Sequence, residues 1–153
     1  MKALIIYHSN YKKHTEMIAR LFADKLNADL IQLKNSGEIN IDRYDLIGFG
    51  SGVYRESMSP QIFHIADRLN VKDKEVFVFS TSGAGMKYYN NKLIQLLELH
   101  GAKCRGSFAC KGSFVSKDFS NNRIFEFMSR FAEGHPNAKD RKKAEKFIEN
   151  IAK

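Results

Sequence analysis

The segment from Ser9 to Thr15 combines the features of an anion-binding loop. Its hydroxyl, amide and lysine side chains separate an apolar run, Ala3–Tyr7, from an amphipathic stretch that we expect to become helical near Thr15. Free backbone N–H groups and the positive end of a helix dipole favour an anion at such a junction. We therefore predict that this loop binds a nucleotide-like phosphate.

Two later loops carry small residues and then aromatic ones. The loop from Gly50 to Pro60 contains two glycines that let the backbone approach a flat ligand, and Tyr54 offers a ring to stack on it. The loop from Ser80 to Gly85 is followed by Tyr88 and Tyr89. Glycine and serine favour turns in any protein, so each loop alone is weak evidence for a ligand site.

The elements around these loops are predicted from apolar runs and helical spacing. The expected strands are Ala3–Tyr7, Leu30–Leu33, Asp45–Gly50, Glu75–Ser80 and Ala102–Ala109. The expected helices begin near Thr15, begin just after Pro60, end at Gly101, and span Ala138–Ala152 behind an Asn137–Asp140 capping box. This alternation predicts one doubly wound α/β domain, residues 1–153, whose parallel sheet is covered on both faces. The three loops then meet at the carboxyl edge of the sheet.

The stretch from Ser116 to Phe131 lies outside this alternation. Ile124, Phe127, Met128 and Phe131 have helical spacing, which indicates an extra helix or an ordered loop. This segment either packs against the core or forms a lid over a partner or an active site, and both roles account for the apolar spacing.

Composition narrows the classes of function. The formal net charge of +8 indicates acidic partners or substrates, or a solvated basic surface. No nucleic-acid-binding motif accompanies the charge, so nucleic acid is not an expected partner. The first apolar run is too short for a signal peptide or a membrane span, and a cytoplasmic location is expected. A phosphorylation receiver domain is disfavoured, because it needs acidic residues where His8 and Gly50 stand.

The two cysteines predict neither a disulfide nor a metal site. Cys104 and Cys110 lie on one expected strand, where their separation would be roughly 20 Å. A disulfide requires Cα atoms within about 7 Å. No paired histidines accompany them, so we interpret both as small buried residues and expect no metal.

Taken together, these motifs resemble the flavodoxin family, in its short-chain form, over nearly the whole chain. The matching segments are Ile6–Asn10, Thr15–Glu16, Ile18–Ala19, Gly50–Tyr54, Phe79–Gly83, Cys110–Gly112 and Gly134–Asn137. The resemblance implies a five-stranded sheet in the order 2-1-3-4-5, with FMN bound where the strand order reverses.

The resemblance also assigns cofactor contacts by position. The phosphate would be held by Ser9, Asn10, Tyr11, Lys13, His14 and Thr15. The flavin ring would be flanked by Ser51, Gly52, Val53, Tyr54, Ser80, Thr81, Ser82, Gly83, Gly85 and Tyr88. The backbone carbonyl of Gly52 would accept a hydrogen bond from N5 of the reduced flavin. No catalytic acid, base or nucleophile is expected, because the flavin itself carries the electrons.

Two departures from the family pattern concern this site. Family phosphate loops usually read Gly-Asn-Thr where this chain has Lys13-His14-Thr15, so the loop meets the phosphate by charge or grips it less tightly. The chain also has no tryptophan to stack on the flavin. Tyr54, and Tyr88 or Tyr89, are the available substitutes.

The function implied by the resemblance is transfer of single electrons between redox partner proteins, which the basic charge of this chain suggests are acidic. An FMN-dependent oxidoreductase on the same fold, such as a quinone reductase or a protoporphyrinogen oxidase-like enzyme, is the alternative. Positive charge from Lys12, Lys13 and Arg55 near the flavin would stabilise its reduced form. We therefore predict a less negative second reduction potential than that of an acidic relative.

Overall fold

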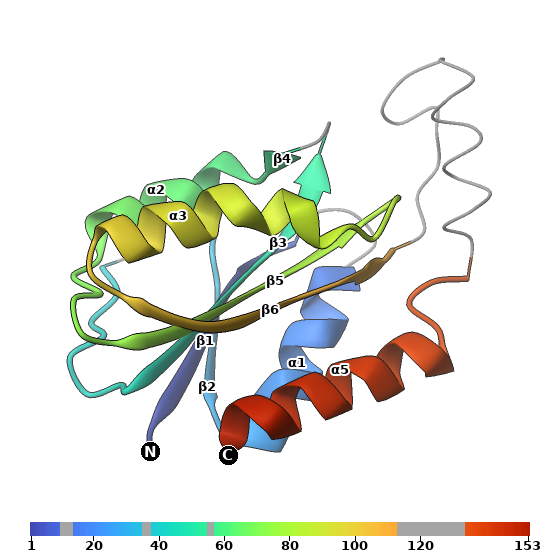
Figure 1. Cartoon of the computed structure of the whole chain (residues 1–153), viewed down its shortest axis with the longest axis horizontal. Coiled ribbons are helices and arrows are strands. Elements are labelled where there is room, and N and C mark those ends of the chain that lie inside the picture. The colour runs from blue at the N-terminus through green and yellow to red at the C-terminus, as the bar shows by residue number, and fades with distance from the viewer. Residues whose placement is uncertain (10–13, 35–37, 55–56, 113–133) are drawn as a thin grey trace.

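The computed structural model describes residues 1–9, 14–34, 38–54, 57–112 and 134–153, and shows a twisted sheet between two layers of helices (Figure 1). The strands are β1 (Ala3–His8), β2 (Asp29–Gln32), β3 (Leu46–Tyr54), β4 (Ser57–Met58), β5 (Glu75–Ser82) and β6 (Lys103–Lys111). The helices are α1 (His14–Leu26), α2 (Pro60–Arg68), the 3-10 helix η1 (Lys87–Asn90), α3 (Asn91–Leu99) and α5 (Ala138–Ala152).

The sheet has the strand order β2-β1-β3-β5-β6, and every pairing along this path is parallel. With β4 set aside, these five strands follow the predicted order 2-1-3-4-5, so the doubly wound α/β fold class is confirmed. The chain moves from β1 outward to β2 and then returns to add β3 on the other side of β1. This reversal is the topological switch point, beside which ligands bind in open α/β sheets.

Each face of the sheet has its own hydrophobic core, because side chains alternate between the two faces of a strand. On one face, Tyr7 and Phe79 pack with Phe22 of α1 and Ile148 of α5. On the other face, α2 and α3 cover a second cluster that includes Ile6, Phe49 and Val78. All six residues of β1 are buried, which explains why its sequence is a continuous apolar run.

The structure extends β3 and β5 beyond their predicted ends. The prediction ended β3 at Gly50, yet it continues to Tyr54, and β5 continues to Ser82. Ser51 is in register with Ser80, and Gly52 with Thr81, so the neighbouring strand satisfies the backbone of these polar residues. Polar side chains were therefore a poor indicator of where these central strands end.

Strand β4 was not predicted from the sequence. This two-residue strand pairs antiparallel with the end of β3, where Val53 is opposite Met58 and Tyr54 is opposite Ser57. A strand of two residues has no periodicity that a sequence pattern could reveal. It leads directly into α2, which begins at Pro60 itself and not just after it as predicted.

Helix α5 begins and ends where the sequence predicts. The Asn137 side chain accepts a hydrogen bond from the Asp140 backbone N–H at 3.0 Å, and the Asp140 carboxylate accepts one from the Asn137 N–H at 2.9 Å. The predicted capping box is therefore confirmed. The Ser116–Phe131 segment, by contrast, lies outside the described residues.

Both cysteines lie on β6, as predicted, and both are free thiols. Cys110 is buried as predicted, whereas Cys104 is only partly buried, and burial raises the pKa of the Cys110 thiol to about 12. A thiol with such a pKa is almost entirely protonated at neutral pH, so it behaves as a small core residue.

Candidate functional site

A row of polar side chains crosses the three central strands at the carboxyl edge of the sheet. His8 of β1 is in register with Ser51 of β3, and Ser51 is in register with Ser80 of β5. All three are buried and continue the face that α2 and α3 cover below them. The apolar core therefore gives way to hydrogen-bonding groups beside the switch point.

Several of these polar atoms have no hydrogen-bond partner among the described residues. They are His8 Nδ1, Ser80 Oγ and, at the start of the first loop, Ser9 Oγ. The residues are 6%, 0% and 5% exposed, respectively. Buried polar groups are nearly always hydrogen-bonded, because leaving one unpaired costs about 1–3 kcal/mol. Their concentration at one edge is what a site for a polar ligand requires.

The start of α1 is held at this edge by two side-chain hydrogen bonds. The Tyr7 hydroxyl donates to Glu16 Oε1 at 2.7 Å, and burial together with this bond raises the pKa of Tyr7 to about 12. Thr15 Oγ1 lies 2.7 Å from Thr81 Oγ1, in a buried contact between α1 and β5. These contacts direct the positive end of the α1 dipole towards the ends of β1 and β5.

The third predicted loop lies against the end of β6. The Ser82 hydroxyl accepts a hydrogen bond from the Gly85 N–H at 2.7 Å, and the Gly112 N–H donates to the Ser82 carbonyl at 2.9 Å. Gly85 has φ of +67°, and a Cβ there would lie 2.9 Å from Cγ of Lys111. Only glycine meets both conditions, so Gly85 is required by the turn itself.

The second predicted loop is joined to the start of α2 through Ser51. Its Oγ donates to the Gly52 carbonyl at 2.6 Å and accepts from the Ser59 N–H at 2.8 Å. Ser59 in turn caps α2 by accepting from the Gln61 N–H at 3.2 Å. The segment from β3 to α2 is thus fixed by short hydrogen bonds.

Gly50 has a packing role that was not predicted from the sequence. It lies inside β3, opposite Phe79 of β5, and a Cβ at this position would be 2.1 Å from Cζ of the Phe79 ring. Gly48 has the same relation to Phe77, at 2.3 Å. These glycines make room for two core aromatic rings, so packing alone accounts for a glycine at position 50.

The Gly50→Ala substitution is expected to reduce the free energy of unfolding by about 1–3 kcal/mol, which is typical of overpacking a core. The Phe79 ring cannot move aside easily, because it packs edge-on against Phe22 at 5.0 Å between centroids. Urea unfolding of Gly50→Ala, Phe79→Leu and the double variant would measure the effect. The free energy of unfolding should fall less in the double variant than the sum of its decreases in the two single variants. Exact additivity of these decreases would contradict the proposed clash.

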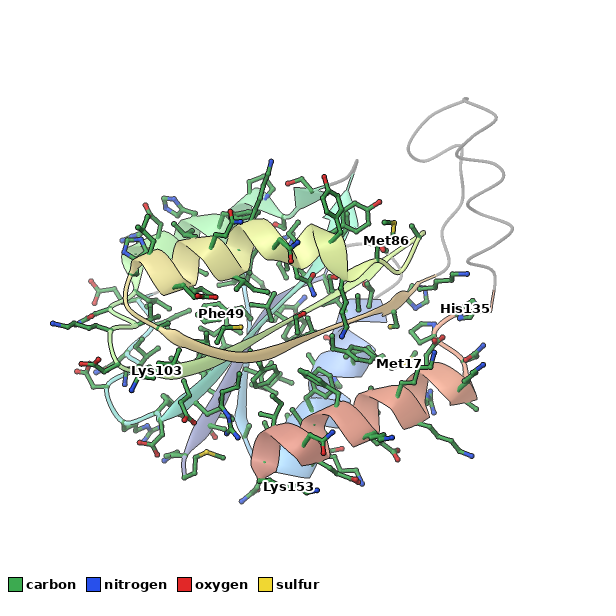
Figure 2. The ribbon with its side chains drawn as sticks, viewed as in Figure 1. Met17, Phe49, Met86, Lys103, His135 and Lys153 are labelled. Atoms are coloured by element: carbon green, nitrogen blue, oxygen red, sulfur yellow. The ribbon has the colours of Figure 1, made fainter. Side chains whose placement is uncertain are left out.

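The predicted site residues fall into three groups. Ser9, His14, Thr15, Ser51, Gly52, Val53, Ser80, Thr81, Ser82, Gly83 and Gly85 lie at or beside the carboxyl edge. Asn10, Tyr11 and Lys13 lie outside the described residues, as do Lys12 and Arg55, and only the backbone of Tyr54 is described. Tyr88 lies on η1 with 66% of its surface exposed, and neighbouring Met86 is 48% exposed (Figure 2).

Two contributors to this edge were given no role from the sequence. His8 belongs to the matching segment Ile6–Asn10 and was noted as a residue that is not acidic, although its place directly after an apolar strand and before Ser9 could have indicated a buried polar row. Gly112 was quoted as part of a motif without a role, and a Cβ there would lie 3.2 Å from the His14 side chain. It allows the end of β6 to approach the first residue of α1.

His8 predicts a dependence of stability on pH. Burial lowers the pKa of His8 below its usual value of 6.5, so His8 binds a proton less readily in the folded protein than in the unfolded chain. The contribution of neutral His8 to the free energy of unfolding is therefore complete above pH 6.5, and it is expected to be lost as the pH drops through 6.5 towards the lowered pKa. Urea unfolding between pH 7.5 and 5 would show this loss.

The His8→Asn variant should show a flatter pH profile, because the titrating group is absent. His64→Asn, which replaces an exposed histidine on α2, is the matched control and should keep the wild-type slope. Equal slopes for wild type and His8→Asn would contradict this assignment.

None of the helices in the described part of the chain combines the length and apolar character needed to cross a bilayer. Within the same residues, no three metal-binding side chains of histidine, cysteine, aspartate or glutamate cluster together.

Comparison with known proteins points to one family. The model of a flavodoxin domain matches residues 4–149. An uncharacterized protein of Methanocaldococcus jannaschii is 37% identical over 155 residues, covering 100% of this chain and 99% of the relative. A solved archaeal flavodoxin superimposes with a TM-score of 0.72 at 14% identity, covering 99% of this chain and 96% of that one. A Lactobacillus acidophilus flavoprotein solved in complex with FMN has a TM-score of 0.59 at 22% identity, covering 69% of this chain and 91% of that one.

Proposed function

Because this chain belongs to the flavodoxin family, we propose that it binds FMN at the carboxyl edge of its sheet and carries electrons between redox partner proteins. The observation that carries the proposal is the set of buried polar atoms, Ser9 Oγ, Ser80 Oγ and His8 Nδ1, that lack a partner among the described residues at this edge. Ser9 directly precedes the loop that leads to α1, a 13-residue helix whose dipole favours an anion at its start, while His8 and Ser80 line the α2 and α3 side of the same edge. The described residues therefore fit a phosphate-bearing cofactor.

The phosphate would be held by Ser9 and Thr15 together with the N–H groups at the start of α1. By their place in the sequence, Asn10, Tyr11, Lys13 and His14 would complete this binding loop. A hydroxyl that donates to a charged phosphate contributes about 1.5–3 kcal/mol, roughly twice a neutral hydrogen bond. When bound, FMN supplies the electron-transfer chemistry, so the protein needs only to bind and tune it.

The ring of the flavin would lie between the ends of β3 and β5. Ser51, Gly52 and Val53 belong to one side, and Ser80 to Gly85 to the other. The Gly52 carbonyl accepts a hydrogen bond from Ser51 Oγ and retains a second lone pair for the proposed bond to the flavin. Exposed Tyr88 is available to stack on the ring, as is Tyr54 by its position in the sequence.

Titration with FMN tests the proposal directly. Addition of FMN to the FMN-free protein should shift the visible flavin absorption bands and quench flavin fluorescence, and riboflavin should bind more weakly because it lacks the phosphate. An FMN spectrum that the protein leaves unchanged would contradict FMN binding.

A second measurement separates the carrier from the enzyme. The reduced protein is expected to pass electrons to a one-electron acceptor such as ferricyanide, without sustained turnover of NAD(P)H in the presence of a quinone. Steady turnover with a quinone or a porphyrinogen would contradict the carrier assignment and favour the oxidoreductase.

The lysines of the phosphate loop give a prediction for the redox potential. Lys12→Glu or Lys13→Glu is expected to make the second reduction potential more negative by roughly 10–40 mV, because one charge contributes about 0.2–1 kcal/mol after screening by solvent and salt. Anaerobic redox titration would measure the change. Lys103→Glu, at the opposite end of β6, is the control and should leave the potential unaltered (Figure 2). Unchanged potentials in the loop variants would overturn this role.

A further inference from the structure

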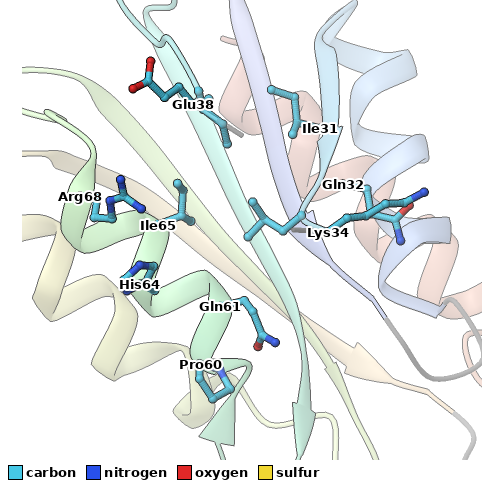
Figure 3. Close-up of a pocket in the computed structure, with 11 residues that line it drawn as sticks. Ile31, Gln32, Lys34, Glu38, Pro60, Gln61, His64, Ile65 and Arg68 are labelled. Atoms are coloured by element: carbon cyan, nitrogen blue, oxygen red, sulfur yellow. The ribbon is translucent and has the colours of Figure 1, made fainter. Parts of the chain in front are cut away.

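The connection between β2 and β3 differs from its neighbours. The chain segments that follow β1, β4 and β5 form α1, α2 and α3, whereas the described residues between Gln32 and Leu46 form no helix. As far as the described residues go, part of the sheet face beside edge strand β2 therefore has no helix over it. A pocket of about 600 Å³ opens there, between β2 and α2 (Figure 3). We call it the β2–α2 pocket.

The centre of the β2–α2 pocket is apolar. Ile31 and Leu33 contribute from β2 and the residue after it, Ile39 from the connection, and Ile65 from α2. All four pack on the core of this face yet remain only partly buried. The volume lies within the roughly 300–1,000 Å³ that is typical of sites for small organic ligands.

The rim of the pocket is mainly basic. Arg68 and His64 come from α2 and Lys34 follows β2, while Glu38 is the only acidic residue among the described residues that line the pocket. Figure 3 shows Arg68, His64 and Ile65 on the α2 side and Glu38 and Pro60 at opposite ends. Neither Arg68 nor Lys34 makes an ion pair within the described residues. A guanidinium that is not neutralised matches the paired oxygens of a carboxylate.

We propose that the β2–α2 pocket binds a small organic carboxylate with an apolar body. The apolar body covers the three isoleucines and Leu33, and Arg68 binds the carboxylate at the rim. Gln32 and Gln61 supply further hydrogen-bonding groups. None of the lining residues belongs to the set proposed to hold FMN, so this site is separate from the flavin site.

The Gln32 side chain connects the two sites. Its Nε2 lies 3.5 Å from the carbonyl oxygen of Ser9, at the start of the phosphate loop. The contact is long and therefore weak. A carboxylate in the pocket is thus expected to change the amide signals of the pocket walls far more than those of the FMN-binding edge.

The probe for this proposal is 2-naphthoate, with neutral 2-naphthamide as its matched analogue. Each is titrated into the 15N-labelled full chain while amide chemical shifts are recorded, with excess FMN present and in a second series without it. The expected result is saturable shifts at residues 31–34, 38–39 and 61–68, with tighter binding of naphthoate than of naphthamide. Because the pocket is separate from the flavin site, the same result is expected without FMN, even if the chain does not bind FMN at all.

Two variants test the assignment of Arg68. Arg68→Gln is expected to weaken naphthoate binding about threefold to tenfold and to leave naphthamide binding unchanged, since only the ion pair is lost. Lys92→Gln removes an exposed cation from α3 and should change neither affinity. Three results would each overturn the proposal. They are an absence of shifts at millimolar probe, shifts confined to residues 9, 14–15 and 80–85, and an equal loss of affinity for both probes in Arg68→Gln.

Discussion

Replacement of Ser9 with alanine is expected to weaken FMN binding about 10- to 100-fold while leaving the FMN-free protein at least as stable as the wild type. Ser9 is 5% exposed, and its buried hydroxyl has no hydrogen-bond partner among the described residues. Without FMN, alanine therefore removes an unpaired polar group and breaks no described bond. With FMN, it removes a hydrogen bond to a charged phosphate, which contributes roughly 1.5–3 kcal/mol.

Two ligands and one control variant isolate this effect. Fluorescence titration should show the large loss of affinity for FMN and a much smaller change for riboflavin, because riboflavin has no phosphate for Ser9 to bind. Ser107→Ala alters a partly buried serine in the middle of β6 and should bind both flavins as the wild type does. If Ser9→Ala weakened FMN and riboflavin equally, Ser9 would not be a phosphate ligand.

The elements of this fold were largely predictable from sequence because a doubly wound sheet is buried on both faces. Central strands must then be continuous apolar runs, as Ala3–Tyr7 is, and such runs can be recognised locally. Helix α5 was predicted to the residue, since Asn137 and Asp140 form a cap that depends only on neighbours in the sequence. The exact ends of β3 and β5 depend on pairing with each other, which no local pattern records.

The site was predictable as a region and not as a set of contacts. Parallel strands place their carboxyl ends at one edge, so topology alone brings Ser9, Ser51 and Ser80 together. The contact between Thr15 and Thr81 joins residues 66 positions apart, and sequence gives no measure of such a distance. The β2–α2 pocket could not be predicted either, because it depends on a helix that this connection lacks in its described part.

Gly50 shows how a glycine can mislead. Glycine next to a polar loop suggests backbone exposed to a ligand, but this glycine accommodates Phe79 on the neighbouring strand. A signal existed in the matched spacing of Gly48 and Gly50 with Phe77 and Phe79. Such pairs become interpretable only when the register between the strands is known. The same rings also determine the largest effect on stability that we predict.

The Phe22→Ala substitution is expected to reduce the free energy of unfolding by about 3–5 kcal/mol, a large part of the roughly 5–15 kcal/mol available to a domain. Phe22 is fully buried at the centre of an aromatic cluster. Its ring centroid lies 5.9 Å from that of Phe77, 5.0 Å from Phe79, 5.7 Å from Phe108 and 5.7 Å from Phe147. Alanine would leave a cavity bordered by rings from two strands and α5, which cannot all close on it.

Urea unfolding with and without FMN would measure this loss and relate it to the site. Phe63→Ala makes the same chemical change at a partly buried position on α2, and it should reduce the free energy of unfolding clearly less than Phe22→Ala does. FMN at 100 times its dissociation constant should restore about 2.7 kcal/mol, because it binds only the folded state. Similar losses for the two variants would contradict the central role of Phe22. If FMN failed to stabilise Phe22→Ala although it stabilised the wild type, the cluster that packs α1 against β5 would be needed to form the flavin site, and not only for folding.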